Sequence, residues 1–167
     1  MSSTRRRQGF TIVELLIVIV VIGILAAITI VAYNGIQDRA TWAKLQGDLS
    51  GINKSIQLYY AENGSYPATA VAPGWSWRYS CATGVSGDSF IPDISTTLAN
   101  LPQAPCKEAS TGNDTWLYGS DGIEYKLIHI RPTISDTMRS NIPSSLRDNR
   151  WSTNGSWGYW SPTAAGR

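Results

Sequence analysis

Glu14 is the residue whose type and position most clearly point to chemistry. It is the single charged side chain in the 23-residue apolar stretch from Phe10 to Ala32. A carboxylate at such a depth in a bilayer costs about 2.5–3.5 kcal/mol even on a lenient insertion scale, and it usually marks function. We therefore interpret Glu14 as half of a charge pair whose positive partner must be supplied from elsewhere.

Cys81 and Cys106 are the two cysteines of the chain. Both lie in the part that is expected to leave the cytoplasm, where disulfides form and persist. We expect a disulfide between them, and the alternative is a pair of buried free thiols. His129 is the one histidine and falls in a predicted strand, on the same face as Tyr125 and Leu127. We interpret it as a half-buried or surface histidine rather than as a ligand.

The remaining polar residues carry no catalytic pattern. The sequence contains no serine nucleophile elbow, no Cys/His metal spacing and no phosphate-binding loop. We therefore predict that the chain is not an enzyme and that it takes no cofactor and no metal.

Composition narrows the class of protein further. Apolar residues make up 43% and charged residues 16% of the 167, which excludes a disordered chain and a coiled coil. Three of the 14 basic residues are Arg5, Arg6 and Arg7, and the other 11 are balanced by 12 acidic ones. Because no basic cluster follows, we infer no contact with nucleic acid.

The apolar stretch that contains Glu14 is predicted to form a membrane-spanning helix. At about 1.5 Å per residue, residues 10–32 span the roughly 30 Å hydrocarbon core. The arginines of segment 1–9 stay in the cytoplasm by the positive-inside rule, so the C-terminal part is translocated. A secretory signal peptide would have a shorter apolar core, and a plain anchor would not explain Glu14.

The run Gly9-Phe10-Thr11-Ile12-Val13-Glu14 resembles the start of the type IV pilins, including the pseudopilins of type II secretion. Their hallmark is a basic leader ending in Gly, then Phe-Thr, then Glu at the fifth mature position, then about twenty apolar residues. The resemblance implies that a prepilin peptidase cuts between Gly9 and Phe10 and methylates the new amine of Phe10. It also implies that Glu14 pairs with the Phe10 amine of a neighbouring subunit, and this pair would fix the axial register of a filament.

Helical periodicity continues beyond the membrane. Leu45, Leu49, Ile52, Ile56 and Tyr59 form one apolar stripe, and Asn63-Gly64 is a stop signal. Shorter strands are predicted at Trp75 to Tyr79, at Leu117-Tyr118 and Ile123 to Ile130 around a turn at residues 119–122, and at Ser156 to Trp160. The predicted fold class is α+β: a long N-terminal helix packed on a small C-terminal antiparallel sheet, the pilin fold. The predicted divisions are a cleaved leader 1–9, a transmembrane and assembly half-helix 10–32, an amphipathic half-helix 33–64 and a globular domain 65–167.

Two weaker signals have two interpretations each. Asp114, Asp121 and Asp136 lie in polar turns, and major pseudopilins can bind calcium through such oxygen ligands, but turn formation is the preferred interpretation. The aromatic C-terminus, with Trp151, Trp157, Tyr159 and Trp160, is interpreted as core filling, and the alternative is an adhesive, sugar-stacking patch.

The function that we predict is that of a structural subunit of a type IV pilus or pilus-like filament, and the alternative is a minor or tip pilin that acts as an adhesive module. The expected partners are other copies of the chain, the prepilin peptidase, the inner-membrane assembly machinery and, before assembly, membrane lipid. The expected location is a single membrane pass with the N-terminus in the cytoplasm, followed by an extracellular or envelope-spanning filament.

Overall fold

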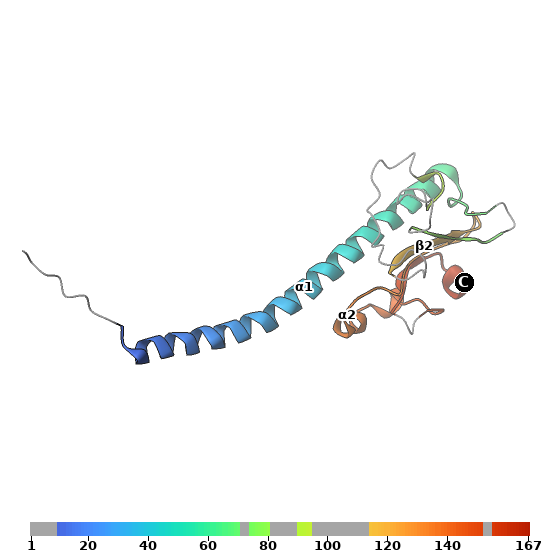
Figure 1. Cartoon of the computed structure of the whole chain (residues 1–167). Helices are drawn as coiled ribbons and strands as arrows, with labels where there is room; N and C mark the ends of the chain where they lie inside the picture. Colours follow the sequence, from blue (N-terminus) through green and yellow to red (C-terminus); the bar gives the residue numbers. More distant parts are fainter. Residues whose placement is uncertain (1–9, 71–73, 81–89, 95–113, 152–154) are drawn as a thin grey trace, which may run out of the picture. The chain divides into compact units, whose positions relative to one another are not determined.

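The computed structural model describes residues 10–70, 74–80, 90–94, 114–151 and 155–167 (Figure 1). Its internal contacts form two compact units, Met1–Ala40 and Thr41–Arg167. Gly9, Cys81 and Cys106 lie outside the described residues, so the predicted cleavage junction and disulfide remain predictions.

Helix α1 runs from Ile12 to Asn63. It ends where the stop signal predicts: Gly64 has a φ of 71° and its N–H donates to the Tyr60 carbonyl at 2.8 Å. Glycine suits this position because a left-handed backbone meets no Cβ there. The helix begins at Ile12 rather than at the predicted residue 10, because Thr11 occupies the capping position before the first helical residue.

The part of α1 in the first unit is apolar and unburied. All side chains from Ile12 to Ile30 are exposed, and Ile12 itself is 86% exposed. By length and composition, α1 is the one helix among the described residues that could cross a membrane. Apolar surface of this extent is unfavourable in water, so lipid or protein must cover it.

The second unit contains a four-stranded antiparallel sheet in the order β1-β2-β3-β4. Each strand pairs with its neighbour in the sequence, so the sheet is a meander. Strand β2 is labelled in Figure 1. Among the described residues, the unit also contains the short helical segments α2, η2 and η4. The bounds are Trp77–Tyr79 for β1, Thr115–Ser120 for β2, Tyr125–Ile130 for β3, Asp136–Ser140 for α2, Ser144–Leu146 for η2, Trp157–Trp160 for β4 and Ala164–Gly166 for η4.

One face of the sheet forms the core with the C-terminal part of α1. The helix contributes its predicted stripe, and the sheet contributes alternate residues of β2, β3 and β4, because successive strand residues point to opposite faces. Tyr125 links the two layers: its hydroxyl donates to Asn53 Oδ1 at 2.7 Å and accepts from Gln57 Nε2 at 2.8 Å. The α+β prediction of a long helix packed on a small antiparallel sheet is confirmed. The buried cluster includes Leu45, Leu49, Ile52, Ile56, Trp116, Tyr118, Tyr125, Leu127 and Trp157.

The predicted hairpin exists, but its predicted turn at residues 119–122 is wrong by two residues. Gly119 and Ser120 belong to β2, and Gly119 lies opposite Lys126 of β3. The turn is set by Asp121, whose Oδ1 accepts from the N–H groups of Ile123 and Glu124 at 3.0 and 2.8 Å. Gly119 is required by packing rather than by a turn, because an added Cβ would lie 2.7 Å from Trp75 Nε1.

Candidate assembly site

The chemistry predicted for the N-terminal segment depends on how the first turn of α1 holds Glu14. Thr11 N–H donates to Glu14 Oε2 at 2.8 Å, and the Thr11 hydroxyl donates to the same oxygen at 2.8 Å. In return, Glu14 N–H donates to Thr11 Oγ1 at 3.3 Å. This reciprocal arrangement is a capping box, which satisfies backbone donors that the first helical turn leaves open.

The capping box leaves part of the carboxylate available. The carboxylate of Glu14 accepts two hydrogen bonds from the described residues. Both come from Thr11, and both end on Oε2. The second oxygen, Oε1, therefore has unused lone pairs. Phe10 lies directly before the cap and is 86% exposed. A positive group from another molecule can reach Oε1 without breaking the bonds to Thr11.

Thr11 is the site residue for which the sequence interpretation gave no role. Its hydroxyl both caps the helix and donates to the carboxylate. The spacing Thr-x-x-Glu before an apolar run is a recognisable capping signal. This pattern in Thr11-Ile12-Val13-Glu14 could have identified Thr11 as the residue that orients Glu14.

His129 differs from its predicted setting. It lies on the predicted face with Tyr125 and Leu127, but it is fully buried rather than half-buried or exposed, since that face is the core. Its Nε2 lies 2.9 Å from Asp114 Oδ1. Burial alone would raise the pKa of Asp114, but the hydrogen bond and charge of His129, together with bonds from Thr133, hold that pKa below its ordinary value. The pair is thus a structural contact at the edge of the core.

The other turn aspartates also have structural roles. Asp121 sets the β2–β3 turn, and Asp136 begins α2 with a fully exposed side chain. Asp114 contacts His129. Within the described ranges, no three His, Cys, Asp or Glu side chains gather as a metal site would require. These contacts support turn formation, the preferred interpretation of Asp121.

Aromatic side chains cover the face of the sheet opposite to α1. Trp160 points to this face while Trp157 points to the core, as the alternation predicts. Cations already lie over some of the rings: Lys126 Nζ is 5.5 Å from the Trp160 centroid, and Arg150 Cζ is 5.0 Å from that of Trp151. This arrangement supports core filling as the role of the aromatic C-terminus, because ring faces that hold cations are less available to a sugar.

Comparison with known proteins identifies the motif at the N-terminus. Residues 4–30 match the family described as the prokaryotic N-terminal methylation motif. The chain is 34% identical to the type II secretion system core protein G of Pseudomonas aeruginosa over 65 residues, which are 39% of this chain and 46% of that protein. The core protein G of Escherichia coli is 32% identical over 69 residues, 41% of this chain and 48% of the relative.

A fimbrial protein is also similar. The fimbrial protein EcpC of Eikenella corrodens is 38% identical over 68 residues, 41% of this chain and 44% of the relative. The chain thus spans less than half the length of each of these curated relatives, and none of the three is named as an enzyme. No solved structure matches the chain significantly. The predicted kinship is confirmed: this chain carries the prokaryotic N-terminal methylation motif and is homologous to type II secretion core proteins G, which are pseudopilins, and to a fimbrial protein.

Proposed function

We propose that this chain is a subunit of a type IV pilus or pilus-like filament. In this proposal the prepilin peptidase cleaves between Gly9 and Phe10 and methylates the Phe10 amine. The mature subunit then polymerises through residues 10–32. The observation that carries the proposal is that the methylation motif at residues 4–30 coincides with a capped carboxylate at the head of an apolar, unburied helix.

The leader and the helix define a route through the membrane. Arg5, Arg6 and Arg7 keep the N-terminus in the cytoplasm. Before assembly, the apolar helix lies in lipid, and the second unit, Thr41–Arg167, lies on the other side of the membrane and is called the globular unit below. Assembly machinery in the inner membrane then transfers the subunit into a filament of copies of the same chain. The exposed apolar side chains of α1 exchange contact with lipid for contact with neighbouring helices.

The pairing step follows from the charges at the head of α1. Cleavage creates a positive amine on Phe10, and in an apolar bundle both this amine and the Glu14 carboxylate are costly when unpaired. The capping box keeps Glu14 partly satisfied in the single subunit, and Oε1 remains for the amine of a neighbour. Contact between the two charges allows one axial register, because other offsets leave both charges without a partner.

The substitution Glu14→Gln separates the charge from the cap. Glutamine also completes a capping box, so the Thr11 bonds and the helix start are retained while the negative charge is lost. We expect Glu14→Gln to insert into the membrane and to be processed, because cleavage requires the leader and Gly9. Filament yield in sheared surface or envelope fractions should fall strongly. Glu14→Ala, which removes the charge together with the cap, should lower the yield to the same extent.

Thr11→Ala is the matched control, since it weakens the cap and keeps the charge. We expect it to reduce filament yield less than Glu14→Gln does. Intact-mass measurement of the membrane-purified wild type should give a chain that begins at Phe10 and carries one extra methyl group. Normal filament yield from Glu14→Gln would refute the charge pairing, and a mature chain that begins near Ala27 would refute the processing.

A further inference from the structure

Among the described residues of the globular unit, Ile123 has the most exposed large apolar side chain. It lies in the turn between β2 and β3 and is 81% exposed, a larger fraction than for any large apolar side chain of α1 between Val13 and Ile30. The turn is fixed, because Asp121 Oδ1 accepts from the Ile123 N–H at 3.0 Å and Tyr66 N–H donates to the carbonyl of residue 122 at 2.9 Å. Turns usually present polar residues to water. An apolar side chain held rigidly at such a tip indicates a contact surface.

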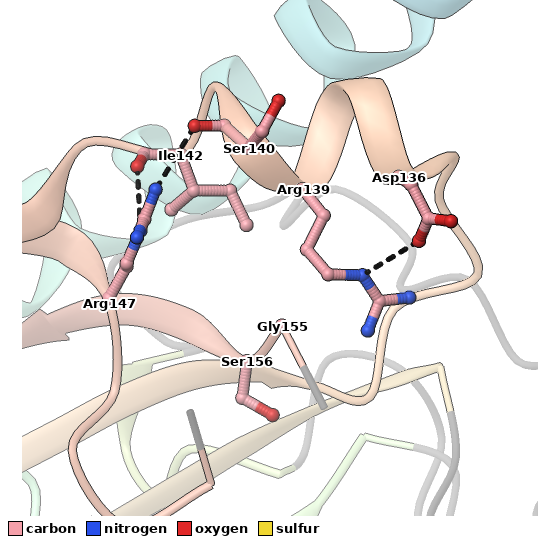
Figure 2. Close-up of a pocket in the computed structure, with 7 residues that line it drawn as sticks. All are labelled: Asp136, Arg139, Ser140, Ile142, Arg147, Gly155 and Ser156. Carbon is pink, nitrogen blue, oxygen red and sulfur yellow. Dashed lines mark hydrogen bonds and ion pairs between the residues drawn. The ribbon is translucent and has the colours of Figure 1, made fainter. Parts of the chain in front are cut away.

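A hollow of about 370 Å³ lies at the opposite end of the same unit, between α2, η2 and the residues before β4 (Figure 2). Contacts with α1 define the two ends. Trp42, near the start of the part of α1 in this unit, packs on Trp157, the first residue of β4, with ring centroids 4.7 Å apart. Tyr60, near the end of α1, stacks on Tyr66, which bonds to the turn of Ile123. The hollow therefore lies beside the start of this part of α1, and Ile123 lies beside its end.

The lining of the hollow favours an apolar occupant. Figure 2 shows the side chain of Ile142 between Arg139 and Arg147. Arg147 is turned to the backbone, since its Nε and Nη2 donate to two backbone carbonyls at 2.9 and 3.0 Å. Ser156 Oγ is also engaged within the unit, because it accepts from the Arg131 N–H at 3.0 Å. The aliphatic part of an arginine packs well on an apolar side chain, so the hollow suits an aliphatic group better than a polar one.

The rim of the hollow is basic. Two guanidiniums and one carboxylate, those of Arg139, Arg147 and Asp136, give it a net charge of +1. Arg139 Nε is buried and makes no hydrogen bond within the described part of the chain. Its ion pair with Asp136 is long, 3.7 Å from Nε to Oδ1, and the Asp136 side chain is fully exposed, so the pair is weak. Arg139 can thus accept a carboxylate from another molecule.

The surroundings of Ile123 have the opposite charge. Asp121 and Glu124 flank it, and these two carboxylates share one cation, Arg167, whose Nη2 lies 3.6 and 3.7 Å from them. Two negative charges and one positive charge leave this end at −1. The unit therefore has an apolar, acidic tip at one end and a basic hollow with an apolar floor at the other.

We propose that Ile123 of one copy of this chain inserts into the hollow of another copy, with Glu124 of the first beside Arg139 of the second. The proposal rests on the proposed function, because a filament repeats one orientation and brings the end of one unit toward the start of another. The two surfaces differ, so the contact is heterologous, and a heterologous contact that does not close on itself continues along a filament. It is far smaller than the roughly 1,200 Å² of a stable interface. It therefore forms only between copies that their apolar helices already hold together.

Cross-linking in assembled filaments of the full-length chain tests the contact directly. Ile123 is replaced by the photoreactive amino acid benzoylphenylalanine in a minority of copies, so that assembly depends on the wild-type majority. After irradiation, linked pairs are digested and identified by mass spectrometry. We expect position 123 to be linked to residues 136–147 of another copy. The same probe at Tyr79, which is also exposed but lies on the edge strand β1, is the matched control and should be linked to other segments.

Charge substitutions give a second readout. Ile123→Arg places a positive charge beside Arg139 and should lower the filament yield by about fivefold or more. Adding Arg139→Glu to the same chain should restore the yield, because a guanidinium then faces a carboxylate across the contact. Tyr79→Arg adds the same charge elsewhere and should change the yield less than about twofold. Melting temperatures show whether each variant is folded, and if Arg139→Glu unfolds the unit, the cross-link decides.

The outcomes separate this contact from filament formation itself. The contact is refuted if wild-type filaments form while position 123 is not linked to residues 136–147, or if Ile123→Arg assembles as well as Tyr79→Arg. A wild-type chain that gives no filaments at all would overturn the proposed function and this contact together.

Discussion

Lys126→Met should destabilise the globular unit far more than a surface lysine substitution would. Lys126 and Asp148 have fully buried side chains, and Nζ lies 2.7 Å from Asp148 Oδ2. Nζ also donates to the carbonyls of Ala165 and Arg167 at 3.1 and 2.7 Å. The ammonium thus has three acceptors, one for each of its protons, and it joins the residues after β4 to the sheet.

The magnitude follows from what methionine leaves behind. Removing one partner of a buried pair costs about 3–5 kcal/mol, because the other charge stays buried without compensation. Asp148 retains the N–H groups of Arg150 and Trp151 on Oδ1, each at 2.8 Å, which places the expected loss at the lower end, about 3 kcal/mol. For a unit of this size, that loss lowers the melting temperature by roughly 10 °C.

Thermal or urea unfolding of the full chain in detergent, followed by tryptophan fluorescence, measures the effect. Lys44→Met is the matched control: Lys44 also lies 3.1 Å from an aspartate, but its side chain is 72% exposed, so the loss should be below about 0.5 kcal/mol. Lys126→Met/Asp148→Asn should recover a large part of the stability, because no unpaired charge remains. Equal losses from Lys126→Met and Lys44→Met, or full additivity in the double variant, would refute the reasoning.

Three further predictions test the packing and the division of the chain. Gly119→Ala should cost about 1–3 kcal/mol of unfolding free energy by forcing Trp75 to move, whereas Gly47→Ala, with no atom within 4 Å of an added Cβ, should be neutral or stabilising in the same denaturation assay. Burial raises the pKa of Tyr125 to about 12 from an ordinary 10.0. The stability that the Tyr125 hydroxyl contributes should therefore be complete below pH 10 and should decline as the pH rises toward 12. The loss of stability over this pH range should be smaller in Tyr125→Phe. A fragment that begins at Tyr33 should be soluble and monomeric in analytical ultracentrifugation, because most of the exposed apolar helix is gone, and large oligomers from it would show that the globular unit carries the assembly.

The sequence alone was sufficient wherever the cause is local. Three features could be predicted without any tertiary contact: the apolar run after Gly9, the carboxylate of Glu14 and the helix stop at Asn63-Gly64. The length of an apolar span, the cost of burying a charge in it and the backbone conformation at a helix end all depend on neighbouring residues. The stripe from Leu45 to Ile56 was also predictable, since a helix packed on one side must repeat at its own period. A capping box lies within four residues, so the role of Thr11 was within reach of the same reasoning.

Only the tertiary structure decided which strand residues face the core and what they contact there. The alternation of β3 placed His129 on the same face as Tyr125 and Leu127. It could not show that this face is fully buried, or that Asp114 contacts His129 at the edge of the core. The turn before β3 lies two residues later than predicted, because Gly119 and Ser120 pair with β3 and Asp121 sets the turn. The packing of Trp75 on Gly119, a contact between distant segments, also could not be read from the sequence.

The pairing of Lys126 with Asp148 has the same origin. These two residues lie in different segments, and no periodicity relates them. Their charges look like ordinary surface charges in the sequence, and a lysine in a strand is most often solvated. The fold determines which charged residues lose water, and this loss makes a buried pair out of residue types that are common on every protein surface.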